Sequence, residues 1–184
     1  MGLKNSLQKF LLKRPFKKKT EKEKLLSARV SKIIGQNVKN LDYYQEAFSL
    51  KIPNKTTGAK NYERLEFLGD AVLGSIISCY LYKNYPVANE GFLTQMKSKI
   101  VNRKNLNSLG EKLKLTDFIQ NGGNGNLGEN ISGNLFEAFI GAYYLDLGYQ
   151  RTKKFVISRV IKIHVDLDNL VNTNDDYKSQ LQIY

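Results

Sequence analysis

The stretch Glu63-Arg-Leu-Glu-Phe-Leu-Gly-Asp70 is the part of this 184-residue sequence from which both the fold and the chemistry can be derived. Its acids, Glu63, Glu66 and Asp70, are spaced i, i+3 and i+7, which places all three on one face of a helix. The pattern predicts an amphipathic helix with an acidic stripe. The apolar side of that helix consists of Leu65, Phe67, Leu68, Val72 and Leu73.

The acidic stripe stands out in a chain dominated by lysine. Acids on an exposed helix are commonly balanced by a base four residues away, but the only base inside the stripe, Arg64, projects elsewhere. Three carboxylates on one face repel each other unless a cation lies among them. Hard divalent cations such as Mg²⁺ and Mn²⁺ prefer such oxygen ligands. From spacing alone, a metal site and a plain charged surface are equally good interpretations.

Helical periodicity continues over most of the chain. Apolar residues recur at helical spacing up to Ile34, where Gly35 predicts a stop, and Asn89 is a predicted cap for a later helix. No alternating strand pattern of any length interrupts these series. We therefore predict an all-α domain with turn-rich loops at 53–58 and 121–126 and with helices over 25–34, 41–48, 62–84, 90–101, 106–113, 131–147 and 151–171.

The positive charge is concentrated at the N-terminus. Residues 1–24 carry nine Lys/Arg and two Glu, a local charge of +7 within a net charge of +12. We expect a solvated basic arm at 1–24 in front of a domain at 25–171. A pI near 9.6 favours polyanionic partners, either nucleic acid or an anionic membrane surface, although a generally basic protein of the ribosomal type has the same composition.

The rest of the composition excludes several kinds of chemistry. A single cysteine, Cys79, excludes an internal disulfide and a cysteine-rich zinc site, and a Cys–His dyad with His164 is not expected. The longest weakly polar run, 71–82, is shorter than the roughly 20 residues that cross a bilayer, and no signal-peptide core precedes it. We expect a cytoplasmic protein with no membrane partner and no small-molecule cofactor.

Another acid lies in an apolar setting. Glu137 belongs to the series Leu135-Phe-Glu-Ala-Phe-Ile140, and a carboxylate buried there requires a partner or a metal. Asn134 is three residues earlier, on the same helix face. Packing this helix against the first would gather Glu66, Asp70, Asn134 and Glu137 into one oxygen-lined site. Such a site suits metal-assisted phosphodiester hydrolysis.

These residues resemble the ribonuclease III family. The stretch Glu63–Asp70 is similar to the family signature at every position, Asn89-Glu-Gly91 resembles its acid-containing turn, and Phe136-Glu-Ala-Phe-Ile-Gly-Ala-Tyr-Tyr-Leu-Asp146 resembles its second conserved helix. The similarity covers residues 25–168. It implies an all-α endonuclease domain, a helical bundle that forms a homodimer and cuts double-stranded RNA in ribosomal RNA processing and messenger RNA turnover.

The resemblance also implies roles for individual residues. Glu66, Asp70, Asn134 and Glu137 would bind Mg²⁺, with Mn²⁺ as a substitute, and Asp70 and Glu137 would be catalytic. The remaining residues with implied roles are Glu63 and Glu90 in the cleavage valley and Phe67 in the dimer interface. For Phe67 the residues alone predict core packing, and only the resemblance assigns it to the interface.

Two features depart from the family pattern. The family has aspartate where this chain has Asn134, which leaves an active variant, an engineered change or an inactive, RNA-binding homologue as alternatives; the intact acids favour the active variant. Residues 172–184 are expected to be a linker and the start of a double-stranded-RNA-binding domain. There Asp176-Tyr-Lys-Ser-Gln-Leu-Gln-Ile-Tyr184 resembles the opening helix of such a domain.

Overall fold

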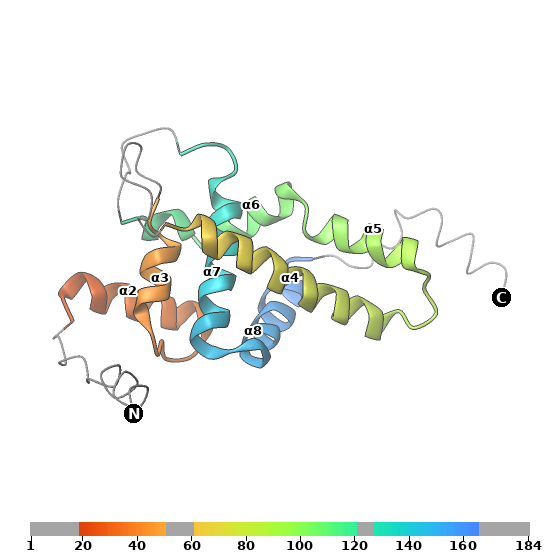
Figure 1. Cartoon of the computed structure of the whole chain (residues 1–184), viewed down its shortest axis with the longest axis horizontal. Coiled ribbons are helices and arrows are strands. Elements are labelled where there is room, and N and C mark those ends of the chain that lie inside the picture. The colour runs from red at the N-terminus through yellow and green to blue at the C-terminus, as the bar shows by residue number, and fades with distance from the viewer. Residues whose placement is uncertain (1–18, 51–60, 121–126, 166–184) are drawn as a thin grey trace, which may run out of the picture.

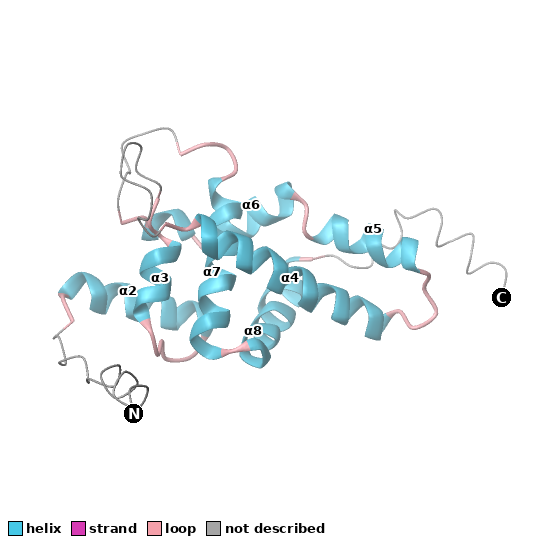
Figure 2. Ribbon diagram, in the orientation of Figure 1, coloured by secondary structure: helices cyan, strands magenta, loops and turns pink. Residues whose placement is uncertain are grey.

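The computed structural model describes residues 19–50, 61–120 and 127–165, and these form a helical bundle (Figure 1). The described residues contain helices and loops but no strand, which confirms the all-α prediction (Figure 2). The elements are α2 Glu21–Ile34, α3 Leu41–Ala47, α4 Glu63–Asn84, α5 Glu90–Ile100, α6 Arg103–Lys112, the 3₁₀ turn η2 Leu115–Phe118, α7 Ile131–Leu147, α8 Tyr149–Phe155, the π-helical turn η3 Val156–Ile161 and α9 Lys162–His164.

Helix α2 begins inside the segment that was predicted to be a basic arm. Thr20 forms a capping box with Glu23: its hydroxyl accepts from the Glu23 backbone N–H at 3.2 Å, and the Glu23 carboxylate accepts from the Thr20 N–H at 2.7 Å. This pairing starts the helix at Glu21, four residues before the predicted domain boundary. Gly35 ends the helix as predicted, in the left-handed conformation (φ 72°).

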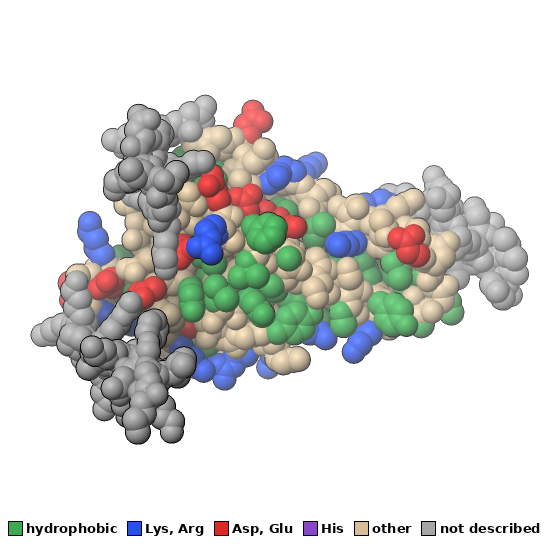
Figure 3. All heavy atoms as spheres, viewed as in Figure 1, with side chains coloured by type: hydrophobic (Ala, Val, Ile, Leu, Met, Phe, Trp, Pro, Cys, Tyr) green, Lys and Arg blue, Asp and Glu red, His purple; other side chains and the backbone are tan. Residues whose placement is uncertain are grey.

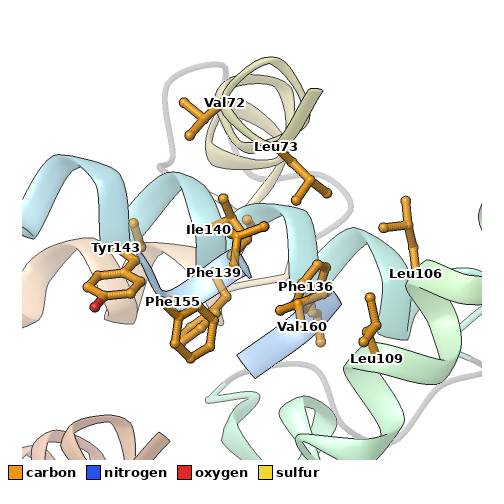
Figure 4. Packing of buried hydrophobic residues seen from close by; sticks show 14 of the residues in the cluster. Val72, Leu73, Leu106, Leu109, Phe136, Phe139, Ile140, Tyr143, Phe155 and Val160 are labelled. Atoms are coloured by element: carbon orange, nitrogen blue, oxygen red, sulfur yellow. The ribbon is translucent and has the colours of Figure 1, made fainter. Parts of the chain in front are cut away.

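The core is built around α7, which packs against α4 on one side and α6 on another (Figure 1). Figure 4 shows Phe136, Phe139 and Ile140 of α7 surrounded by side chains from α4, α6 and the C-terminal helices. The two central helices approach very closely. A Cβ on Gly69 would lie 1.7 Å from the carbonyl oxygen of Glu137, and one on Gly141 would lie 2.3 Å from that of Leu65.

The C-terminal segment differs from the single helix predicted over 151–171. It begins at Tyr149 and changes to a π-helical turn over Val156–Ile161. Residues five apart are rotated by about 140° around an α-helix. The pairs Phe155/Val160 and Val156/Ile161 are nevertheless all buried, and a wider turn brings such pairs toward the same side. Burial therefore overrides the regular helix here.

Hydrogen bonds accepted by Asp146 connect the end of α7 to α3 and to the segment between α2 and α3. Its carboxylate accepts from the backbone N–H groups of Lys39 at 3.2 Å and Asn40 at 2.6 Å, and from the hydroxyl of Tyr44 at 3.1 Å. Tyr44 is fully buried, and burial together with the adjacent Asp146 charge raises its pKa. The hydroxyl therefore remains a neutral donor to Asp146.

Helix α4 is long and apolar enough, by length and composition alone, to cross a membrane, which the sequence analysis did not anticipate. Core helices of soluble proteins meet the same criterion, and the apolar side of α4 packs on α7. The predicted loops at 53–58 and 121–126, the segment 172–184 and most of the basic arm lie outside the described residues.

Candidate active site

The acidic stripe occupies the first two turns of α4. The Asn61 side chain accepts from the Glu63 backbone N–H at 3.0 Å and so caps the start of the helix. Glu63 and Glu66 lie in the first turn, where negative charge interacts favourably with the helix dipole. The charges of these two acids therefore help to stabilise the helix.

A cleft of about 750 Å³ brings the stripe together with the acid of α7. Glu137 lies at the crossing of α4 and α7 and is only 7% exposed. In the space-filling view, acidic side chains gather near the beginning of α4, close to basic side chains and to an apolar area along the helix (Figure 3). The cleft is lined by Glu63, Glu66, Phe67, Asp70, Val101, Arg103, Leu106 and Glu137.

The carboxylates of the cleft influence each other. Burial raises the pKa of Glu137 to about 7, with the negative charges of Asp70 and Glu66 acting in the same direction. Burial also raises the pKa of Glu66, assisted by the charges of Glu63 and Asp70. The positive charge of Arg103 opposes both shifts. The cleft thus carries more negative charge than its basic lining residue, Arg103, neutralises.

Arg103 is a cleft residue that sequence reasoning missed. It is the first residue of α6, and its Nη1 donates to Oδ1 of Asn134 at 2.6 Å. A cation in the first turn of a helix is unfavourable for the helix dipole. Arg103 and Lys104 both occupy that turn, so this local conflict was a signal that the sequence contained.

The donor set of the cleft suits a hard divalent cation. Glu66, Asp70 and Glu137 line the cleft and supply carboxylate oxygens. Asn134 is not a lining residue, but its amide oxygen accepts a hydrogen bond from Arg103, which is one. Within the described ranges, no three His, Cys, Asp or Glu side chains stand close enough to share one ion. The residues therefore fit the chemistry of such an ion, and binding it requires their side chains to rotate inward.

Phe67 and Glu90 occupy positions that the residues alone did not predict. Phe67 is 80% exposed at the rim of the cleft, so its predicted packing in the core of this chain is wrong. Glu90 begins α5, and its carboxylate accepts from the Thr94 hydroxyl at 2.7 Å. The other end of α5 leads to Val101 in the cleft, and a helix of 11 residues is about 16 Å long. Glu90 therefore lies outside the cleft of its own chain.

Sequence comparison finds the same family in several bacteria. The profile described as "Ribonuclease III domain" matches residues 63–148. Ribonuclease 3 of Flavobacterium psychrophilum is 44% identical over 167 residues, which span 89% of this chain and 68% of that protein. The Zunongwangia profunda protein is 47% identical over 82% of this chain and 63% of its own length. The Leptospira interrogans protein is 39% identical over 100% of this chain and 74% of its own length.

Solved structures share the fold. The nuclease domain of ribonuclease III from Campylobacter jejuni superposes with a TM-score of 0.64 at 27% identity, covering 73% of this chain and 95% of that one. Dicer from Giardia intestinalis gives a TM-score of 0.63 at 20% identity over 80% of this chain and 20% of its own, a likeness of fold alone. On these matches, and with every residue that lines the acidic cleft inside the matched region, the chain belongs to the ribonuclease III family of nucleases.

Proposed function

We propose that this chain is a divalent-metal-dependent endonuclease that hydrolyses the phosphodiester bonds of double-stranded RNA. The observation that carries the proposal is Glu137, a carboxyl group buried beside Asp70 and Glu66 in one acidic cleft. Burying a carboxylate among other carboxylates is unfavourable unless a cation offsets their charge. Membership of the ribonuclease III family supports the same chemistry.

Four residues would hold the metal: Glu66, Asp70 and Glu137 through carboxylates and Asn134 through its amide oxygen. Mg²⁺ is the expected ion, and Mn²⁺ is a substitute for it, since both prefer oxygen ligands. When bound, such an ion supplies an activated water and stabilises charge on the phosphate oxygens. Asp70 and Glu137 border the cleft on facing helices and would orient that water from both sides.

The net charge of +12 supports a polyanionic substrate. Recognition of an RNA duplex relies on its shape and its 2′-hydroxyl groups, because side chains do not reach the bases in its deep, narrow groove. We propose that the protein acts in the cytoplasm, in ribosomal RNA processing and messenger RNA turnover.

A homodimer would complete the site. The Campylobacter jejuni nuclease domain has a region involved in dimer formation. Phe67 is exposed beside a second cavity of about 620 Å³, whose border includes Leu65, Leu68 and Leu145. These apolar side chains would form a contact surface for a second copy of the chain. Glu90, remote from the cleft of its own chain, would line the cleavage valley from the partner.

Asn134 favours a second candidate, a nuclease with weakened metal binding. Its amide oxygen carries no negative charge, and it already accepts a hydrogen bond from Arg103. A weakened enzyme would bind duplex RNA and cleave it slowly. Replacing the amide by a carboxylate, Asn134→Asp, distinguishes the two candidates, because it restores the missing charge without changing side-chain size.

Cleavage of a long RNA duplex with Mg²⁺ tests the proposal. We expect cutting by the natural chain and a loss of at least about 100-fold in rate for Glu137→Gln, which removes a metal-binding charge. Glu111→Gln, a change of the same kind on the exposed surface of α6, should cut normally. Binding without cleavage in either Mg²⁺ or Mn²⁺ contradicts the proposal, whereas a large gain of rate in Asn134→Asp identifies the weakened enzyme.

A further inference from the structure

Arg103 is held at the cleft by α6 and by Asn134. The Asn102 side chain caps α6 by accepting from the Asn105 backbone N–H at 2.8 Å, so the first residue of the helix has a defined position. From there the guanidinium reaches Asn134 on α7, at an N–O distance of 2.6 Å. This contact joins α6 to α7, and Arg103 also lines the cleft that contains Glu66 and Glu137.

The guanidinium acts as a counter-charge to the acids. It lines the same cleft as Glu66 and Glu137, so its positive charge lies among their negative charges. This arrangement does not stabilise α6, because a cation at a helix N-terminus is disfavoured. The benefit of Arg103 therefore lies in the cleft, where it offsets repulsion among the carboxylates.

A divalent cation bound by these ligands and the Arg103 guanidinium would compete for the same part of the cleft. Both are positive, so each raises the free energy of the other within a few ångströms. Both also use the Asn134 amide oxygen, one as hydrogen-bond acceptor and the other as ligand. That oxygen is bonded to Arg103, and in the described part of the chain no three His, Cys, Asp or Glu side chains are close enough to share one ion. A neutral amide holds a guanidinium less strongly than a carboxylate does, which makes the contact exchangeable.

We propose that Arg103 is a built-in cation that a divalent metal ion must displace from Asn134 and the cleft carboxylates, so that Arg103 sets the metal affinity of the site. The inference rests on the proposed metal-dependent function. It predicts two linked effects of removing the guanidinium charge: the metal-free protein loses stability, and the metal binds more tightly. These effects share one cause, because a less favourable metal-free state makes metal binding more favourable.

Calorimetric titration of the full chain with Mn²⁺ measures the predicted change in metal affinity. After treatment with a chelator, Arg103→Gln should bind Mn²⁺ at least about threefold more tightly than the natural chain. Lys104→Gln removes the same charge from the adjacent exposed position and should change the affinity by less than about twofold. Thermal unfolding of the metal-free proteins should show a lower midpoint for Arg103→Gln than for Lys104→Gln.

The displacement itself can be followed in the natural chain, whatever the stability of the variants. Addition of diamagnetic Mg²⁺ should shift the side-chain Nε–H resonance of Arg103, which is assigned by its loss in Arg103→Lys. An unmoved resonance at saturation, or a Mn²⁺ affinity of Arg103→Gln no higher than that of the natural chain, overturns the inference and leaves the proposed nuclease intact. A natural chain that binds no Mn²⁺ at millimolar concentration and cuts no RNA overturns both.

Discussion

At the scale of single residues, the position of Glu137 in the fold changes the pKa of its carboxyl group. The residue is 7% exposed, and burial with the charges of Asp70 and Glu66 raises its pKa to about 7. The carboxyl therefore changes protonation near neutral pH instead of near its usual value. Arg103 and a divalent cation both favour its ionised form, so the ionisation of Glu137 and the cationic content of the cleft depend on each other.

The raised pKa of Glu137 predicts how stability depends on pH in the metal-free protein. Between about pH 4.5 and 7 the folded state holds a proton that the unfolded state has released, so the free energy of unfolding falls as pH rises through this range. Above it, Glu137 is ionised in both states and the dependence ends. Glu137→Gln has no carboxyl group to ionise at this position. Between pH 5 and pH 8, its free energy of unfolding should therefore rise by up to about 3 kcal/mol relative to that of the natural chain.

Urea unfolding at several pH values, with chelator present, provides the measurement. Glu111→Gln serves as the matched control, because its carboxylate is exposed on α6 and away from the cleft. Parallel pH profiles for Glu137→Gln and the natural chain would contradict the assigned pKa of Glu137.

At the scale of elements, the crossing of α4 and α7 positions the site. Gly69 lies within the acidic stretch, one residue before Asp70, and faces the backbone of Glu137. The absence of a side chain allows the two helices to approach until Asp70 and Glu137 border the same cleft. Gly141 makes the equivalent approach to the backbone of Leu65, one helical turn earlier on α4.

Gly69→Ala tests the crossing. The added Cβ would lie 1.7 Å from the Glu137 carbonyl oxygen, so the helices must separate, and overpacking of this kind costs about 1–3 kcal/mol. We expect a lower unfolding midpoint and, since Glu137 moves away from Asp70, slower RNA cleavage. Thermal unfolding and the duplex-cleavage assay report the two effects.

Gly74→Ala is the control on the same helix. Its Cβ would meet only the flexible side chain of Lys97, at 3.4 Å, and alanine is the better helix former. This variant should be as stable as the natural chain or more so. A Gly69→Ala protein that behaves like Gly74→Ala would show that the close approach is not required.

At the scale of the whole molecule, the apolar surface near the cleft predicts self-association. Phe67 is 80% exposed at the border between the acidic cleft and the neighbouring cavity that contains Leu145. Large exposed aromatic residues next to apolar cavities are typical of protein interfaces. A second copy placed there would join the two acidic clefts into one surface for duplex RNA.

Sedimentation of the Phe67→Ala variant tests this arrangement. The natural chain should be a dimer at micromolar concentration, and the variant should shift toward monomer and lose cleavage activity, because a central aromatic contact typically contributes about 2 kcal/mol or more to an interface. Leu25→Ala removes another exposed apolar side chain, on α2, and should leave the dimer unchanged. A natural chain that remains monomeric at this concentration contradicts the dimer.

The sequence by itself determined what depends on neighbours along the chain. The spacing of Glu63, Glu66 and Asp70, the Asn89 cap and the Gly35 stop are local features, and the helices that they predicted lie within a few residues of the observed ones. Local signals were also present for the Thr20–Glu23 capping box, although the predicted boundary did not use them.

Only the tertiary structure decided the features that depend on contacts between distant segments. The exposure of Phe67, the raised pKa of Glu137, the π-helical turn after Phe155 and the bond from Arg103 to Asn134 each depend on packing between elements. Helical periodicity identifies which side of a helix is apolar, but it carries no information about which neighbour covers that side. The acidic stretch Glu63–Asp70 could therefore be identified in the sequence, whereas the local signal at Arg103 did not indicate that this cation lies in the same cleft as those acids.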